Sequence, residues 1–308
     1  MTGHERAAVA AASSSGLEAT WNRFWFEPAD PRPLAVVRML TGALALALLS
    51  SYTADLVAWF GPQGMIPADA AAPWRSPFGW SLFDFATTPD SLRLLLAVTG
   101  IVLGLLAVGL ATPLVSLAAA ILWASLLHRG PMLAGPADDC VAVLLWCLAI
   151  GQSGGAWSLD HWFRGSREPA AASIRSRIAL SLIQVHAAAI TVASLLAQLK
   201  GDVWWDGTAA WWLTARTDSR LVDLAGLFTR SEYLCNLVTH AITGFELAFA
   251  VGLWFAATQT IVARVGLVAW PLIGLLAGEP SWGLAMAIFC VPLAFNGPRG
   301  GRGTGPRR

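Results

Sequence analysis

Charged residues are scarce in this sequence. Asp, Glu, Lys and Arg together make up only 13% of the 308 residues, about half of the roughly 25% that soluble domains contain. Hydrophobic residues make up 56% and occur in long blocks, which is the pattern of membrane-spanning helices. The net charge is only +1 and no basic stripe is present, so we expect no nucleic-acid partner. The sequence predicts a multi-pass membrane protein surrounded by membrane lipid.

Cysteine is also rare, and its spacing excludes the usual metal centres. The four cysteines form no CxxC pair, and no Cys/His cluster has zinc-site spacing. We therefore expect no metal. Cys140 and Cys235 fall near the outer ends of two predicted helices. Packing as small buried residues is the favoured interpretation, and a disulfide between them is the alternative, because sequence does not fix connectivity.

The long apolar runs predict an all-α fold, namely a polytopic transmembrane helical bundle of about eight spans. Two of the spans are short for a bilayer that needs roughly 20 helical residues. The expected spans are about 34–51, 92–111, 113–128, 139–151, 178–200, 234–257, 262–277 and 283–295.

The segments outside the bundle have their own predictions. A short amphipathic helix at 17–26 places Trp21, Phe24 and Trp25 on one face and is expected to lie in the headgroup layer. One transmembrane domain is expected over 17–296. The ends at 1–16 and 297–308 are polar and are expected to be disordered.

The distribution of arginine predicts the orientation in the cell membrane. If the N-terminus is cytoplasmic, twelve arginines lie in the inner segments and five in the outer loops. Inner segments carry the excess of Lys and Arg in membrane proteins. Both termini are therefore expected in the cytoplasm.

Ionisable residues at membrane depth are costly, so each needs a partner or a function. Arg38 in the first span is expected to snorkel to the inner interface, with an internal ion pair as the alternative. His186 is expected to bond a neighbouring helix. Glu246 lies near the middle of the sixth span and is either protonated or paired, with Arg38 or an imidazole as its partner. His240, six residues earlier on the same helix, points to a different face. Structural and functional roles both remain open for Glu246.

The hairpin between the third and fourth spans carries further polar residues. His128 ends the third span, and Asp138 opens the fourth. In the predicted topology this hairpin faces outward, and so does the end of the fifth span with Lys200. One hypothesis is that His128, Asp138 and Lys200 share an outward-facing pocket. The alternative is an ordinary hairpin in which Asp138 caps its helix.

Lys200 is the only lysine in the chain. It follows an apolar run and precedes four tryptophans, in SLLAQLKGDVWWDGTAAWW (194–212). Lysine can lose its proton when it is desolvated, whereas arginine cannot. In a dry, tryptophan-walled site, Lys200 could act as a neutral amine base. The alternative is a lysine that snorkels to the membrane surface.

Four separated segments resemble one family in the same order. They are FEPADPRPLAVVRMLTG (26–42), HRGPMLAGPADD (128–139), GGAWSLD (154–160) and IQVHAAAITVASLLAQLKGDVWWDGTAAWW (183–212). Together they resemble the HTTM (horizontally transferred transmembrane) proteins, which are relatives of vitamin K-dependent γ-glutamyl carboxylase. Glu246 in the sixth span also matches.

The resemblance implies a quinol-dependent epoxidase or carboxylase with an outward-facing site. Lys200 matches the amine base that deprotonates reduced vitamin K, and His128 lies where a histidine assists. Trp204, Trp205, Asp138 and Glu246 are the expected cofactor-binding residues. Oxygen and carbon dioxide would be co-substrates, and an exported protein or a lipid-borne molecule would be the acceptor.

Two departures from the family favour a different hypothesis. The carboxylase has a large region after its spans that holds its protein substrate, and only 13 residues follow the last span here. A histidine that many relatives carry in a late helix is absent, with Trp270 or nearby residues in its place. The alternative is a non-catalytic membrane module that binds a quinone, a lipid or a partner protein.

Overall fold

The secondary structure of the chain is helical. The computed structural model describes residues 16–61, 63–75, 79–165, 171–217 and 220–295. These residues form α-helices and short 3-10 helices, and apart from one isolated bridge between Ala29 and Ser173 they form no strand. The predicted all-α class is confirmed. The predicted disordered ends lie outside the described residues, apart from residue 16, which is helical.

Eight apolar helices occupy the eight predicted positions. Six are long and apolar enough to cross a membrane, and α7 and α15 have 15 residues each, as the two short predicted spans required. The six long helices are α2 (Arg32–Ser51), α5 (Pro89–Val108), α6 (Thr112–Arg129), α9 (Ile174–Gln198), α13 (Glu232–Gly252) and α14 (Ala256–Ala277). The shorter pair are α7 (Pro136–Ile150) and α15 (Pro280–Ala294).

Several predicted boundaries were wrong, including the start of α14 at Ala256 rather than 262, and the ends of α5 and α13 have local reasons. α5 stops at Val108 because Gly109 takes a left-handed conformation with φ 76°, which glycine adopts without strain. α13 stops at Gly252 rather than at 257. A Cβ on Gly252 would lie 2.8 Å from Val262, so the glycine permits the close turn into α14. Apolar residues continue through this turn, which is why hydropathy alone extended the span.

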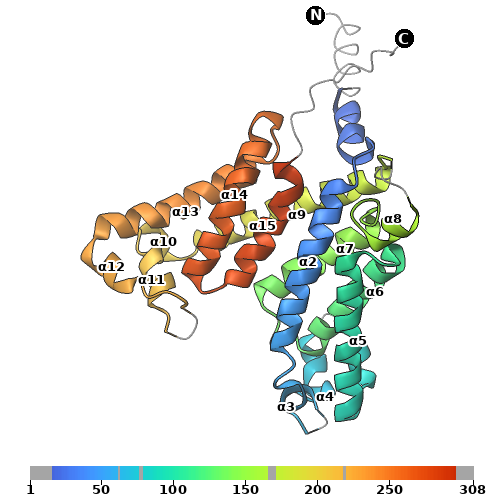
Figure 1. Ribbon diagram of the computed structural model, residues 1–308. Coiled ribbons are helices and arrows are strands. Elements are labelled where there is room, and N and C mark those ends of the chain that lie inside the picture. Colours follow the sequence, from blue (N-terminus) through green and yellow to red (C-terminus); the bar gives the residue numbers. More distant parts are fainter. Residues whose placement is uncertain (1–15, 62, 76–78, 166–170, 218–219, 296–308) are drawn as a thin grey trace, which may run out of the picture.

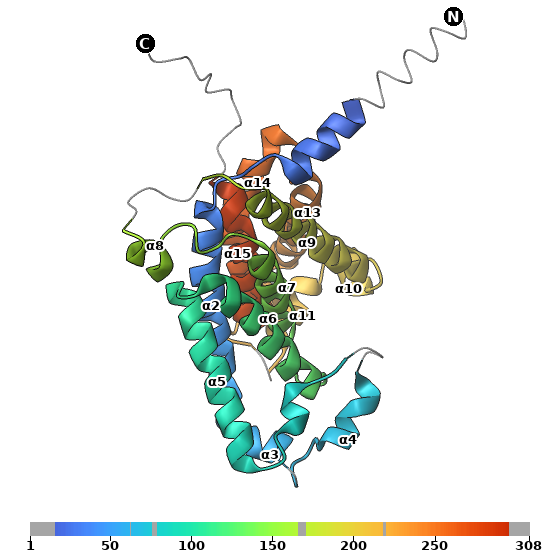
Figure 2. The ribbon, with the colours of Figure 1, turned by 90° about the vertical axis from the view of Figure 1, so that its right-hand side faces the viewer.

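The helices pack around two apolar clusters that share α2 and α7. The first cluster joins these two helices to α9, α13, α14 and α15. The second joins them to α5 and α6 and to the short helices α3 (Leu56–Phe60) and η2 (Leu82–Phe85). Figures 1 and 2 show the result. In Figure 1, α13 and α14 lie on one side of α2, whereas α5 and α6 lie on its other side. The described chain begins and ends at the same end of the bundle, as an even number of spans requires (Figure 1).

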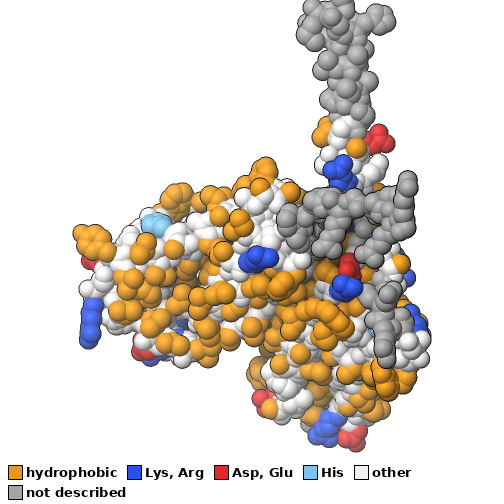
Figure 3. Space-filling view, turned by 45° about the horizontal axis from the view of Figure 1, so that its top comes forward, with side chains coloured by type: hydrophobic (Ala, Val, Ile, Leu, Met, Phe, Trp, Pro, Cys, Tyr) orange, Lys and Arg blue, Asp and Glu red, His pale blue; other side chains and the backbone are white. Residues whose placement is uncertain are grey.

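The outside of the bundle is apolar. Hydrophobic side chains cover most of the face in Figure 3, whereas the charged ones are few and scattered. Apolar surface of this extent is unstable in water and is typical of contact with lipid. Exposed large side chains on the long helices include Leu94, Ile101, Leu114, Leu237, Ile261, Val268 and Leu272. The fold therefore defines an integral membrane protein.

The connections carry short helices that position the polar groups. α4 (Ala68–Ala71) and η1 (Ala72–Trp74) lie with α3 and η2 between α2 and α5, and α8 (Leu159–Phe163) lies between α7 and α9. α10 (Asp202–Trp205), α11 (Ala209–Ala215) and α12 (Ala225–Arg230) connect α9 to α13.

The expected N-terminal amphipathic segment is also helical, over residues 16–26. The rings of Trp21 and Trp25 lie 5.8 Å apart on one face, and Phe24 contacts Trp254 after α13 at 6.1 Å. Ser181 of α9 donates a hydrogen bond to the Phe24 carbonyl at 2.6 Å, so the end of this helix is fixed to the bundle.

Candidate functional site

The predicted pocket of His128, Asp138 and Lys200 is not formed. His128 ends α6, where its Nδ1 lies 2.9 Å from the Trp80 carbonyl. Lys200 follows α9 and is exposed. In Figures 1 and 2, α10 beside Lys200 lies at a different part of the bundle from α3 and α4, near which α6 ends. The cavity of about 290 Å³ that Asp138 lines includes neither His128 nor Lys200.

Asp138 instead has the local role that the alternative interpretation gave it. Its Oδ2 accepts a hydrogen bond from the Gly135 amide at 2.8 Å, at the start of α7. The Tyr52 hydroxyl lies 3.4 Å from the same oxygen, and the Trp123 indole donates to the Asp138 carbonyl at 3.1 Å. These contacts join α7 to the end of α2 and to α6.

A different cavity forms beside the lysine. It has a volume of about 300 Å³ and lies between α9, α10 and α13. Its walls are mostly apolar and include both predicted tryptophans. The lining residues are Leu195, Gln198, Leu199, Trp204, Trp205, His240, Thr243 and Leu247.

The tryptophans reach the cavity because α9 ends in a turn. Gly201 follows Lys200, and the Trp205 indole donates back to the Leu199 carbonyl at 3.1 Å. Trp204 is half-buried, whereas Trp205 is 67% exposed. Lys200 itself is exposed and does not line the cavity. The expected tryptophan walls therefore belong to the cavity and not to the surroundings of the lysine.

A buried polar network lies behind this cavity. Glu246 is 1% exposed, and its Oε2 accepts a hydrogen bond from the Gln198 side-chain amide at 2.9 Å. The Ser194 hydroxyl donates to Oε1 at 3.3 Å. Thr243 donates to the Gln198 Oε1 at 3.0 Å. Gln198 thus connects the buried carboxyl to the cavity wall.

The predicted partners of Glu246 were therefore wrong. Neither Arg38 nor an imidazole contacts it; an amide and a hydroxyl of α9 do. Ser194 and Gln198 are four residues apart and lie on one face of α9, turned toward α13. The spacing of these two polar residues is the sequence signal that could have predicted them as partners of Glu246. The prediction considered only charged or imidazole partners and therefore missed them.

Arg38 and His186 also differ from their predictions. Arg38 is fully buried and does not snorkel; its guanidinium donates to the carbonyls of Ser153 at 2.9 Å and Trp157 at 2.6 Å. The His186 Nδ1 lies 2.8 Å from the Leu182 carbonyl of its own helix, so its bond is not to a neighbouring helix. Both residues are held by backbone groups.

Asp160 was not singled out from the sequence, although it holds the start of α6. Its carboxylate accepts hydrogen bonds from the Ala111 amide, the Thr112 amide and the Thr112 hydroxyl, each at 2.7 Å. Burial alone would raise the pKa of Asp160, but these bonds and the charge of Arg164 lower it below its ordinary value.

Disulfides and metal sites are absent from the described part of the chain. All four cysteines are free and buried, so the alternative of a Cys140–Cys235 disulfide was wrong. Cys140 packs in the first apolar cluster, whereas Cys235 packs with Ala210 and Phe228 in a small separate cluster. No group of three His, Cys, Asp or Glu side chains within the described ranges could hold a metal ion.

The apolar helices define a multi-pass α-helical membrane protein, and an apolar cavity lies between its helices α9, α10 and α13. No protein-family model, curated protein or solved structure matches the chain. The HTTM resemblance therefore stays a prediction that rests on its four sequence segments.

Proposed function

We propose that this integral membrane protein binds a lipid-borne quinone or quinol in the cavity between α9, α10 and α13. The observation that carries the proposal is the buried network of Glu246, Gln198 and Thr243 directly behind an apolar, tryptophan-lined cavity. Small-molecule sites combine apolar walls with a few convergent polar groups. A buried ionisable residue in a membrane span is by default a functional-site hypothesis.

The residues present fit such a ligand. Trp204, Trp205 and Leu195 offer flat and apolar contacts to a ring. His240 lines the cavity, and its ring makes no hydrogen bond to a described residue. It is therefore available to a quinone oxygen, and so is the second N–H of the Gln198 amide, whereas the Thr243 hydroxyl already donates to Gln198. The same cavity would accept the ring of a quinol, whose hydroxyls can donate as well as accept.

The test is binding of vitamin K quinone to the purified full chain, measured by mass spectrometry after gel filtration. His240→Phe keeps an aromatic ring but removes the polar contact, and we expect about a tenfold weaker affinity, since one hydrogen bond of about 1.4 kcal/mol is lost. His186→Phe is the matched control, because that ring bonds only within α9. Equal affinity of native protein and His240→Phe would contradict the proposed site.

Catalysis by Lys200 is the second candidate function. The favouring observation is that Lys200 lies between Leu199 and Trp204, which both line the cavity. A bound quinol would supply the reducing equivalents, and the exposed Lys200 amine would accept a proton from it once the ligand has desolvated the lysine. His128 lies outside this cavity, so this candidate rests on Lys200 alone. Oxygen and carbon dioxide would be the co-substrates, and an exported or lipid-borne molecule the acceptor.

Two variants separate binding from catalysis. Purified protein is incubated with reduced vitamin K and oxygen, and the epoxide is measured by mass spectrometry. Lys200→Ala and Lys200→Arg are both expected to abolish epoxide formation, because arginine keeps the charge but cannot lose its proton. If both variants bind the quinone and the native protein forms no epoxide, the binding function stands and the catalytic one is rejected.

A further inference from the structure

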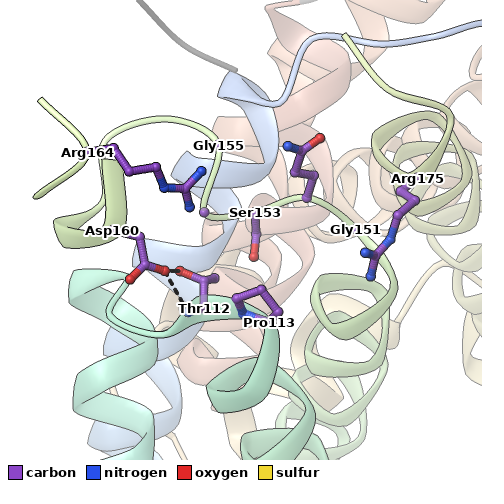
Figure 4. A pocket seen from close by; sticks show the side chains of 10 residues that line it. Thr112, Pro113, Gly151, Ser153, Gly155, Asp160, Arg164 and Arg175 are labelled. Carbon is purple, nitrogen blue, oxygen red and sulfur yellow. Dashed lines mark hydrogen bonds between the residues drawn. The ribbon is translucent and has the colours of Figure 1, made fainter. Parts of the chain in front are cut away.

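A further cavity lies at the other end of the bundle, near the first turns of α2. It has a volume of about 230 Å³. One wall is the glycine-rich loop GQSGG at 151–155, which follows α7. The other lining residues include Thr112, Asp160, Arg164 and Arg175, so the start of α6, α8 and the start of α9 all contribute (Figure 4).

The cavity has an excess of positive charge. Figure 4 shows Arg164 and Arg175 extending from opposite sides toward the loop that carries Ser153. The Arg175 Nε donates to the Ile150 carbonyl at 3.1 Å, which fixes this guanidinium beside the loop. Arg164 makes no hydrogen bond to a described residue. Both oxygens of Asp160, the acidic lining residue, already accept hydrogen bonds from the start of α6.

A buried hydroxyl in the cavity wall has no partner. Ser153 is 1% exposed, and within the described residues its Oγ accepts and donates no hydrogen bond. Its backbone carbonyl, by contrast, accepts from Arg38 at 2.9 Å. A buried polar group without a partner is uncommon and costly. A ligand oxygen in the cavity would supply the missing bond.

The loop is also held close to the helices around it. A Cβ on Gly154 would lie 2.5 Å from the Thr112 hydroxyl, and one on Gly151 would lie 2.8 Å from Ala179. Only glycine therefore fits at these two positions. Glycine loops let a ligand approach backbone amides, and paired arginines bind the oxygens of a phosphate.

Aromatic side chains place this cavity at the depth of lipid headgroups. Trp162 and Phe163 of α8 are 71% and 67% exposed, and Trp157 in the preceding loop is also exposed. Exposed aromatic rings at the end of a transmembrane bundle are typical of the interface. We propose that this cavity binds a phosphate group, supplied by the headgroup of an anionic membrane phospholipid.

The experiment is native mass spectrometry of the full chain in detergent, with phosphatidylglycerol and phosphatidylcholine as probes. R164Q/R175Q is expected to weaken phosphatidylglycerol binding by about fivefold per arginine. The matched control is R93Q/R220Q, which removes the same charge from two arginines that pair with nearby aspartates. The control should bind phosphatidylglycerol like the native protein.

Ser153→Ala provides a test that does not depend on charge. Because the hydroxyl has no partner in the protein, its removal should leave the melting temperature unchanged or raise it. Binding of phosphatidylglycerol should nevertheless weaken by about threefold, since one hydrogen bond to the ligand is lost. A fall in melting temperature without a fall in affinity would show that the hydroxyl serves the fold, and would overturn its role as a ligand group.

Soluble competitors identify the source of the phosphate. Millimolar inorganic phosphate or glycerol phosphate should displace phosphatidylglycerol only weakly if the lipid tail adds to binding. Full displacement, with the same dependence on Arg164 and Arg175, would support the phosphate site and assign it to a soluble ligand. The proposal is overturned if phosphatidylglycerol binds no better than phosphatidylcholine, or if the control variant loses as much affinity as R164Q/R175Q.

Discussion

The hydrogen bonds around Glu246 should couple α9 to α13 by a measurable free energy. Gln198→Leu removes the donor at 2.9 Å, and Glu246→Leu removes the acceptor of both Gln198 and Ser194. In each single variant a buried polar group loses its partner, which costs about 1–3 kcal/mol in water-soluble proteins. The double variant removes both the Gln198 amide and the Glu246 carboxyl. Its loss of stability should therefore be smaller than the sum of the losses in the two single variants.

The membrane sets the size of this coupling. Interhelical hydrogen bonds in membrane proteins average about 0.6 kcal/mol and reach about 1.7, because the unfolded state also finds partners. Gln198 donates directly to the buried Glu246 carboxyl at 2.9 Å, so we expect a coupling of about 1 kcal/mol, in the upper part of that range. The single variants should each lower the free energy of unfolding by about 1–2 kcal/mol.

The assay is reversible unfolding by SDS in mixed micelles, followed by circular dichroism for the native protein, both single variants and the double variant. The coupling is the difference between the double variant and the sum of the singles. Leu92→Ala, in the other apolar cluster, combined with Gln198→Leu, is the control and should be additive. Strict additivity of Gln198→Leu and Glu246→Leu would refute the network.

Further predictions concern the backbone, the pH dependence and the thiols. Gly109→Ala should destabilise the protein by more than about 1–2 kcal/mol, because φ is 76° and a Cβ would collide with Arg38, whereas Gly104→Ala, with open space around it, should be neutral or stabilising in the same unfolding assay. Because the pKa of Asp160 is lowered in the fold, its ionised form stabilises the protein above about pH 4, and this contribution is lost at lower pH. Asp160→Asn should therefore lose less stability than the native protein between about pH 5 and 3. The four buried free cysteines should react with a maleimide only after unfolding, and rapid labelling of the native protein would contradict their burial.

The helices could be predicted from the sequence because lipid leaves few alternatives. A backbone inside a bilayer must satisfy its own hydrogen bonds, so long apolar runs become helices, and all eight runs did. The end of α13 escaped prediction, since apolar residues continue through its turn at Gly252. The positions of His128 and Lys200 show that the contacts between helix ends were harder to predict than the helices themselves. Both residues end a span that was predicted to run outward. Which helix ends come together, however, depends on how the helices pack around α2 and α7. The periodicity of the sequence does not predict that packing.

The buried polar groups of this bundle separate into two kinds, and only one kind indicates function. Arg38 lies wholly inside, and its two terminal guanidinium nitrogens donate to the carbonyls of Ser153 and Trp157, so its role is explained by the loop that it holds. Glu246 is equally buried, but its network continues through Gln198 to the wall of a cavity. A buried polar group that serves only the fold needs no cavity beside it. The opening beside Glu246 therefore favours a ligand site there, and it makes His240→Phe, which leaves the network intact, the sharper test of function than any change to Glu246 itself.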